Sequence, residues 1–269
     1  MKLSISNIAF SNDSDSVFLS KIASARFDAI DIAPNKVWPN WKLPEDYGSS
    51  YRNYVYSYGL KIIGIQSLFF NAGSYNLFSC ETRINEFYSH LKLISRIAIS
   101  TGANKIIFGS PANRNTELVD ISNIWDIAKE RLRYIGDYYH TIGLKLCIEP
   151  TPKQFGGSFL CSTKETEIFI KAVNHPAICL NLDTAILDLE CVSINNTITD
   201  CGEIIGHVHA SEPSLGNFSN PKIDHHKVSQ ALKDINYKGT VAIEMLNQPS
   251  CDMENLEGAL NYISEIYGQ

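Results

Sequence analysis

The sequence predicts an α/β protein that folds as a (β/α)8 barrel of the TIM type. Short apolar runs with strand character alternate with longer helical patterns along nearly the whole chain, which indicates a parallel sheet. Eight such units follow one another, the number that closes a barrel. The length of 269 residues is close to the roughly 250 residues typical of that fold, so a single barrel domain over residues 1–269 is expected.

Each expected element has a local reason. Residues 2–9 alternate apolar and polar side chains as a strand does, and Ser14 or Asp15 could cap the helix that follows. Gly102 ends a long helical pattern, as glycine commonly does. The expected strands are residues 2–9, 27–33, 60–70, 104–110, 145–148, 177–183, 203–209 and 239–244. The expected helices are one around residues 17–23 and others over 44–58, 81–100, 122–142, 163–173, 192–200, 224–235 and 252–267, and residues 34–43 are expected as a loop.

The alternation of strands and helices leaves one structural alternative. A doubly wound open sheet also alternates strands with helices, and its first strand commonly leads into a GxGxxG turn. No such turn follows residues 2–9 in this sequence. The closed barrel is therefore the preferred interpretation.

Composition and charge argue against several classes of protein. The net charge is −6 and the 23 Lys and Arg residues are scattered without a basic run, so no nucleic-acid partner is expected. No apolar run approaches the roughly 18 residues of a membrane span, and the N-terminus lacks a signal-peptide pattern. The seven cysteines form no CxxC pair, and Cys147 and Cys179 are interpreted as small buried apolar residues. We expect a cytoplasmic, reduced protein without a membrane partner.

The last four expected strands finish on side chains that can bind a divalent metal. In chain order these side chains are Glu149, Asp183, His209 and Glu244. They are separated by 34, 26 and 35 residues, each about the length of a βαβ unit of roughly 30 residues or more. Because the active site of a (β/α)8 barrel lies at the carboxyl ends of its strands, the four should meet at one rim. Three carboxylates and one imidazole suit divalent Mn, Mg, Co or Zn, so a metal site is predicted here.

Other polar residues could line the same rim. His207 lies two residues before His209 and so on the same side of its strand. It either contacts a metal ligand or the substrate, or is a core histidine with its hydrogen bonds satisfied. Arg114 follows the fourth expected strand, where its guanidinium fork could bind a substrate carboxylate or phosphate. The remaining candidates for substrate binding are Lys36, Trp38, Gln66 and Glu212. His225 and His226 begin a helix and are expected at the surface.

The segments around the four metal-binding candidates resemble a known family. IEP at 148–150, LDT at 182–184, HVHASE at 207–212 and IEM at 243–245 are similar to the xylose-isomerase-like TIM-barrel superfamily, in particular its sugar phosphate isomerase/epimerase branch. The resemblance covers nearly the whole chain. It implies one divalent metal ion held by the four residues, with a sugar's adjacent carbonyl and hydroxyl oxygens completing the coordination. It also implies that Glu149 and Glu244, on opposite faces of the sugar, exchange protons at a carbon next to the carbonyl through an enediolate.

The chain departs from the ketose 3-epimerases of that branch at three positions. Where those enzymes carry a substrate-binding His, an Arg and a Glu, this chain has Ile186, Leu215 and Phe155. The metal-binding set is therefore intact while the substrate-binding set is altered. This combination favours an unusual substrate, such as a modified or acidic sugar, over a free hexulose.

Three functions remain open on the sequence alone. The first is a metal-dependent sugar isomerase or epimerase. The second is a lyase of the inosose dehydratase type, which would expel a β-hydroxyl from the same enediolate. The third is a non-catalytic sugar-binding barrel, favoured if Ile186 and Leu215 mean lost activity. An endonuclease IV-like enzyme is rejected. Resemblance to that branch would imply a three-metal site with many more histidines than the seven in this chain.

The aromatic residues between Trp38 and Tyr58 are candidates for the contact of a homodimer.

Overall fold

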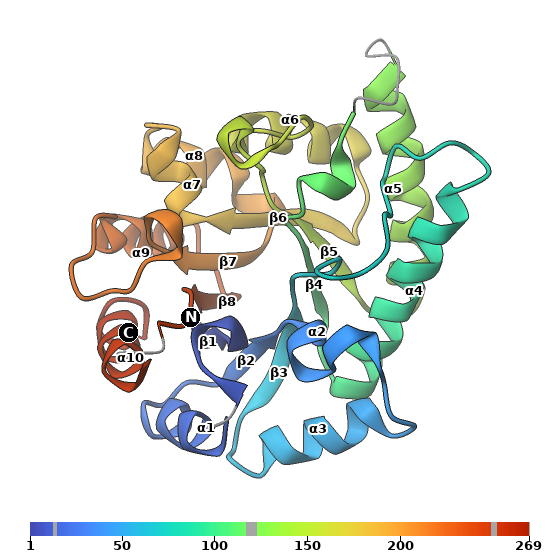
Figure 1. Cartoon of the computed structure of the whole chain (residues 1–269). Coiled ribbons are helices and arrows are strands. Elements are labelled where there is room, and N and C mark those ends of the chain that lie inside the picture. The colour runs from blue at the N-terminus through green and yellow to red at the C-terminus, as the bar shows by residue number, and fades with distance from the viewer. Residues whose placement is uncertain (13–14, 117–122, 249–251, 269) are drawn as a thin grey trace.

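A computed structural model describes residues 1–12, 15–116, 123–248 and 252–268. Within these residues, eight parallel strands form a closed barrel in chain order, from β1 (Lys2–Ser6) to β8 (Thr240–Glu244), which pairs with β1. Figure 1 shows the helices surrounding the strands. The predicted (β/α)8 barrel is confirmed.

The strands are short and almost completely buried. Parallel strands covered by helices must be apolar on both faces, which explains their near-continuous runs of Ile, Leu and Val. The six strands between β1 and β8 are β2 Ala29–Ile32, β3 Lys61–Ile65, β4 Lys105–Phe108, β5 Lys145–Ile148, β6 Ile178–Asp183 and β7 Ile205–Ser211.

The helices begin and end on recognisable signals. Ser162 caps α6 by accepting a hydrogen bond from the backbone N–H of Glu165, and Gly102 ends α4 with a left-handed φ of 87°. The helices are α1 Asp15–Ser24, α2 Pro34–Val37, α3 Tyr47–Tyr56, α4 Ile84–Thr101, α5 Ile124–Thr141, α6 Thr163–Val173, α7 Thr184–Leu189, α8 Ile194–Cys201, α9 His225–Asp234 and α10 Asp252–Tyr267. None of the helices in the described ranges is both long and apolar enough to cross a bilayer.

Several boundaries differ from the sequence prediction. The segment 34–43, expected as a loop, contains α2, which Pro34 begins because its fixed φ suits the first turn of a helix. The unpredicted helix α7 follows β6 directly, because Asp183 is its N-cap and accepts from the Ile186 N–H. β3 ends at Ile65, so residues 66–70 leave the barrel as a loop rather than extending the strand. The cap predicted at Ser14 lies outside the described residues.

A small apolar cluster fills the barrel beneath the carboxyl ends of β4 to β6. It consists of Ile107, Cys147 and Cys179, and the two sulfur atoms lie 3.4 Å apart. The prediction that both cysteines are buried is confirmed. Gly206 on β7 permits this packing, because a Cβ atom there would lie 2.2 Å from the Cys179 sulfur. Since Cys147 lies two residues before Glu149, the cluster underlies the rim that carries the predicted ligands.

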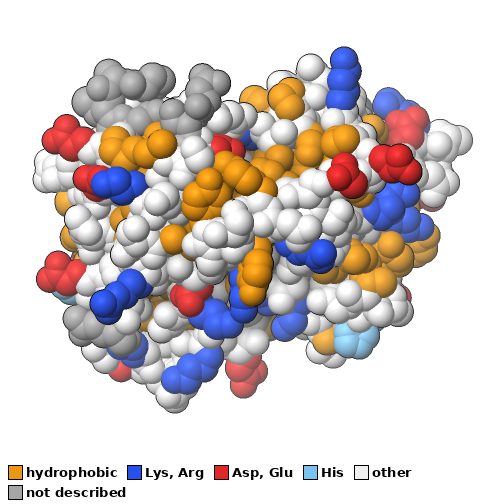
Figure 2. Space-filling view, turned by 90° about the horizontal axis from the view of Figure 1, so that it is seen from below, with side chains coloured by type: hydrophobic (Ala, Val, Ile, Leu, Met, Phe, Trp, Pro, Cys, Tyr) orange, Lys and Arg blue, Asp and Glu red, His pale blue; other side chains and the backbone are white. Residues whose placement is uncertain are grey.

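Figure 2 shows the side of the molecule that carries α1 and α3. Hydrophobic side chains gather across this side, with Lys, Arg, Asp and Glu interspersed around them. Tyr54 and Tyr56 of α3 and Val17 of α1 are among the exposed large hydrophobic residues. The contact of a homodimer on this aromatic segment stays a prediction.

Candidate metal centre and active site

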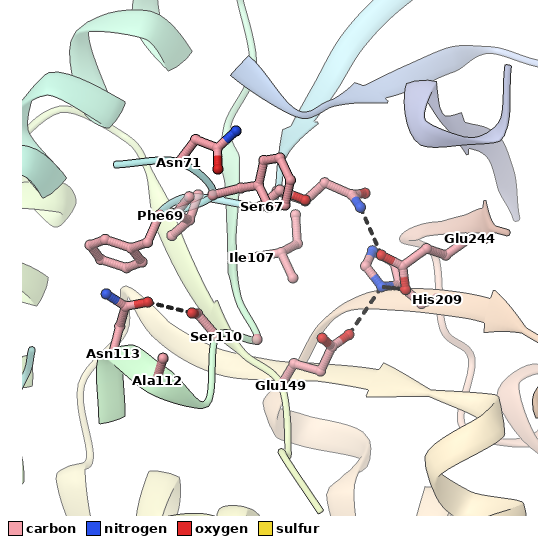
Figure 3. Close-up of a pocket in the computed structure, with 14 residues that line it drawn as sticks. Ser67, Phe69, Asn71, Ile107, Ser110, Ala112, Asn113, Glu149, His209 and Glu244 are labelled. Carbon is pink, nitrogen blue, oxygen red and sulfur yellow. Dashed lines mark hydrogen bonds and ion pairs between the residues drawn. The ribbon is translucent and has the colours of Figure 1, made fainter. Parts of the chain in front are cut away.

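The four predicted metal ligands meet at the carboxyl ends of β5 to β8. One ligand atom from each of Glu149, Asp183, His209 and Glu244 lies within 4.8 Å of the others. Nδ1 of His209 is 3.0 Å from Oε1 of Glu149 and 3.2 Å from Oε2 of Glu244. Figure 3 shows the two carboxylates beside the His209 ring.

This donor set fits a divalent metal ion. The His209 side chain is only 1% exposed, and among the described residues its Nε2 has no hydrogen-bond partner, while Nδ1 faces the two glutamate carboxylates. A buried polar atom without a partner is costly, and coordination to a metal would remove that cost. Carboxylate oxygens and an imidazole nitrogen are ligands that Mg, Mn and Zn accept. The group could therefore hold one metal ion.

The charges of the group also favour a bound cation. Burial raises the pKa of Asp183 to about 7, and the charges of Glu149 and Glu244 act in the same direction. Burial opposes a charge on His209, but the adjacent Glu244 and Glu149 outweigh it and raise the pKa of His209 well above its ordinary value. The cluster thus concentrates negative charge that a cation would compensate.

Two buried amides orient the two glutamates. Nε2 of Gln66 donates to Oε1 of Glu244 over 2.7 Å, and Nδ2 of Asn181 donates to Oε1 of Glu149 over 2.5 Å. Burial acts to raise the pKa of Glu244, but the charge of His209 and the hydrogen bonds from His209 and Gln66 lower it overall. Each glutamate is therefore held in place by a neutral donor.

Asp183 is fixed from both of its oxygens. Oδ1 accepts from the Ile186 N–H over 2.9 Å, and Oδ2 accepts from the Ser211 hydroxyl over 2.7 Å. The sequence analysis missed Ser211 and Asn181. Both lie two residues from a predicted ligand on the same strand, so the alternation that singled out His207 would have found them as well.

Two cavities open at the metal-binding group and share Gly109, Glu149 and Glu244. One has a volume of about 420 Å³ and is lined by Gln66, the loop 67–71 after β3 and residues after β4 such as Ser110 and Asn113 (Figure 3). The other has a volume of about 620 Å³ and extends over the loops after β5, β6 and β7. Both volumes are within the range of small-molecule sites.

The sequence matches the family model of the xylose isomerase-like TIM barrel over residues 19–265. The chain belongs to this family. It is 30% identical over 115 residues to D-psicose 3-epimerase of Agrobacterium fabrum, a match that covers 43% of this chain and 39% of the relative. It is 27% identical over 129 residues to D-psicose 3-epimerase of Ruminiclostridium cellulolyticum, covering 48% and 44%. The chain thus spans less than half the length of the relatives it matches.

A solved member of similar fold is D-psicose 3-epimerase in the presence of D-fructose. It has a TM-score of 0.83 to this chain at 20% identity, and the match covers 100% of both chains. The similarity extends over the whole barrel.

Gln66, one of the predicted substrate-binding residues, lies beside the metal-binding group and donates a hydrogen bond to Glu244. His207 is fully buried, with Nε2 2.7 Å from Oδ2 of Asp31. The Ser4 hydroxyl donates to the other oxygen of Asp31 over 3.0 Å. His207 thus lies inside the barrel, and its role as a substrate contact stays a prediction.

Arg114 lies beneath the rim rather than in a cavity. It is 1% exposed, and its Nη2 donates to the backbone oxygen of Glu149 over 2.7 Å and to Oγ1 of Thr151 over 3.0 Å. Its guanidinium carbon is 5.1 Å from the centre of the Phe108 ring. Burial lowers the pKa of Arg114 to about 10, against the opposing effect of Glu149. In this structure Arg114 supports the backbone that carries Glu149.

Glu212 and His225 form a buried pair, so the prediction that His225 lies at the surface is wrong. Oε1 of Glu212 is 3.0 Å from Nε2 of His225, and Oε2 accepts from the Lys222 N–H over 2.7 Å. The other His225 nitrogen is 2.8 Å from the Tyr267 hydroxyl. His225 is buried because its ring contacts both Glu212, in the loop after β7, and Tyr267, at the end of α10. His226 is exposed, as predicted.

Lys36 and Trp38 are not brought to the metal-binding group. Lys36 donates from Nζ to the backbone oxygen of Phe10. Trp38 lines a different cavity, of about 390 Å³, together with Tyr47 and Tyr51 of α3. The loop after β2 therefore folds toward α3 in this structure.

Proposed function

We propose that this protein is a divalent-metal-dependent sugar isomerase or epimerase that moves a proton at a carbon next to a carbonyl, through an enediolate. The observation that carries the proposal is the pair Glu149 and Glu244, which contact one histidine from two strands. Membership of the xylose isomerase-like family supports it, and the matched relatives are named as 3-epimerases.

The proposed roles follow from the geometry. Glu149, Asp183, His209 and Glu244 would hold one ion of Mn, Mg, Co or Zn. Such an ion supplies Lewis-acid stabilisation of the oxygen that becomes negative as the proton leaves. Glu149 and Glu244 would remove and return the proton, because each of them lines both cavities. Return of a proton to the same carbon from the opposite face, by the second carboxylate, gives an epimer, whereas return by the first carboxylate to the neighbouring carbon of the enediolate gives an isomer.

Asn181 and Gln66 would keep the two carboxylates in position during proton transfer. Each donates one hydrogen bond to a carboxylate oxygen. A side-chain amide does not titrate in the physiological range, so it can orient a carboxylate without competing for the proton. The substrate would be a small sugar or sugar derivative that reaches the rim through the two cavities.

The test is a metal analysis followed by an exchange assay. Wild type, Glu149→Gln and Glu244→Gln are purified, their metal content is measured, and each is incubated in D2O with Mn²⁺ and a panel of ketoses, sugar phosphates and uronates. We expect wild type to hold one divalent ion per chain and to incorporate deuterium at a carbon of at least one sugar. Both variants should fail to incorporate deuterium. Glu254→Gln, a substitution at an exposed position of α10, should still incorporate it.

Each contrary outcome has a definite meaning. Wild type that binds no metal would overturn the four-ligand site. Metal binding without exchange would favour a non-catalytic sugar-binding barrel. Loss of water with a new ultraviolet absorption of an enone would assign the lyase reaction instead.

A further inference from the structure

The larger cavity at the metal-binding group has a lining that combines carboxylates with apolar residues. It is lined by Glu149, Asp183 and Glu244, and also by several prolines and by four large apolar side chains. These four, which we call the apolar wall, are Phe155, Ile186, Leu189 and Leu215. Three of them, Phe155, Ile186 and Leu215, are the positions where the sequence resemblance implies polar substrate-binding residues.

The apolar wall is partly open to solvent. Phe155 is 57% exposed and Leu189 is 39% exposed, whereas Ile186 is 9% exposed. Scattered exposed apolar residues are normal, but a group of them inside a cavity is typical of a ligand site. The wall therefore offers apolar surface that a ligand could cover.

The wall is held by the same segments that hold the metal ligands. Ile186 and Leu189 lie on α7, whose N-cap is Asp183. The Leu215 N–H donates to the oxygen of Glu212 over 3.0 Å, and the Leu215 oxygen accepts from the Leu246 N–H over 2.9 Å. The wall is thus preformed, and its position relative to the metal-binding group is fixed.

Phe155 is also anchored through the backbone. Its N–H donates to the oxygen of Pro152 over 2.9 Å. Two residues later the chain passes so close to the oxygen of Thr151 that a Cβ atom on Gly157 would lie 1.6 Å from it. Only glycine fits at position 157, so the backbone of the turn that carries Phe155 can pack closely against Thr151.

The charges around the cavity decide which kind of substituent fits. Among the described residues that line it, none is Lys, Arg or His, whereas Asp188 and Glu212 add to the three ligand carboxylates. Away from the metal-binding group, a phosphate or carboxylate on the substrate would meet like charges with no Lys, Arg or His side chain to pair with among these lining residues. This argues against the acidic sugar favoured by the sequence alone.

We propose that the substrate is a neutral sugar derivative that carries an apolar substituent, and that the apolar wall binds this substituent while the sugar lies at the metal-binding group. The inference rests on the proposed function, because it places the sugar at Glu149 and Glu244. The apolar wall and the metal-binding residues line the same cavity. A substituent on the bound sugar would therefore reach the wall.

The test compares matched ligands that differ in the substituent alone. Titration calorimetry measures binding of phenyl and methyl β-D-glucopyranosides, and of the corresponding galactopyranosides, to the Mn²⁺-loaded protein. Burial of a phenyl ring predicts that at least one phenyl glycoside binds about tenfold or more tightly than its methyl partner. Phe155→Gln should abolish that difference, whereas Ile99→Gln, an exposed apolar residue on α4, should leave it unchanged.

Several results would overturn the inference. One is equal affinity within every pair, absence of binding included; another is a phenyl preference that survives Phe155→Gln. Dimerisation that Phe155→Gln abolishes would assign the wall to a second copy of the chain.

The two proposals can fail separately. If the protein prefers phenyl glycosides but shows no proton exchange, the apolar wall stays a binding site and the proposed enzymatic function is rejected. Exchange on free ketoses, together with equal affinity of the phenyl and methyl partners in every pair, would keep the enzymatic activity and rule out the apolar substituent.

Discussion

Neutral hydrogen-bond donors hold both glutamates of the site. Oε1 of Glu149 accepts from Asn181, and Oε1 of Glu244 accepts from Gln66. A lysine or arginine in either position would compete with a metal ion for the carboxylate, whereas an amide orients it without adding charge. The two amides thus make the glutamates available to a cation and to a substrate at once.

Gly109 gives the Glu149 carboxylate its space. A Cβ atom at this position would lie 2.1 Å from Oε2 of Glu149, so Gly109→Ala must turn that carboxylate away. Because a misplacement of about 1 Å can cost roughly 100-fold in rate, we expect the deuterium-exchange rate to fall by about that factor. The rate is measured with Mn²⁺ on the sugar that the panel identifies.

A matched glycine provides the control for this substitution. Nothing lies within 4 Å of a Cβ atom built on Gly258, which is exposed on α10. Gly258→Ala should keep the exchange rate and stabilise the fold by about 0.5–1 kcal/mol, because alanine favours a helix over glycine. If Gly109→Ala exchanged as fast as Gly258→Ala, the close approach to Glu149 would have no catalytic importance.

The strands that carry the site could be predicted because buried parallel strands have a strong sequence signal. A carboxylate or histidine at the end of an apolar run is conspicuous, and four such residues at βαβ spacing define one rim. The helix α6 was predicted with its observed bounds, Thr163–Val173, because Ser162 caps it and Asn174 ends it in a left-handed conformation. Local signals were sufficient for these elements.

Loop residues could not be placed in the same way, because distant contacts decide where they point. Arg114 donates to Glu149 and Thr151, 35 and 37 residues further along the chain, and no local pattern reveals those partners. His225 is drawn inside by Tyr267, 42 residues away. Helix α7 was missed because Asp183 acts as its N-cap as well as a predicted ligand.

The loop after β3 depends on a buried histidine of α4. Nε2 of His90 is 2.7 Å from the backbone oxygen of Leu68, and the His90 ring stacks on Tyr75 at 4.7 Å between centroids. Burial lowers the pKa of His90, despite the hydrogen bond to Leu68. His90 is therefore harder to protonate in the folded protein than in the unfolded chain, where a histidine accepts a proton below about pH 6.5.

The sign of the pH effect follows from this difference. The stability that neutral His90 provides is fully present above its unfolded pKa and is lost as the pH falls through the folded pKa. Urea unfolding between about pH 7.5 and pH 5.5 should show that wild type loses more free energy of unfolding than His90→Gln does. The control His226→Gln, at an exposed position of α9, should follow wild type. Parallel curves for wild type and His90→Gln would contradict the assignment.

Closure of the barrel brings four ligands from four consecutive strands to one rim. The chain has a net charge of −6, and three carboxylates of this rim lie within 4.8 Å of one another and of His209. Such a group repels itself in the absence of a cation. Repulsion among these carboxylates lowers the free energy of unfolding of the barrel. A bound cation would remove that repulsion and so stabilise the folded protein.

Metal removal is therefore predicted to lower the melting temperature. An ion that binds only the folded state at about 100 times its Kd stabilises by about 2.7 kcal/mol. For a chain of this size that corresponds to a Tm roughly 5–10 °C higher in Mn²⁺ than after EDTA treatment. Glu149→Gln replaces one ligand with a neutral side chain of the same shape, so its Tm should rise less when Mn²⁺ is added. An equal rise in both proteins would show that the ion binds elsewhere, because the four residues at the rim would then be irrelevant to its affinity.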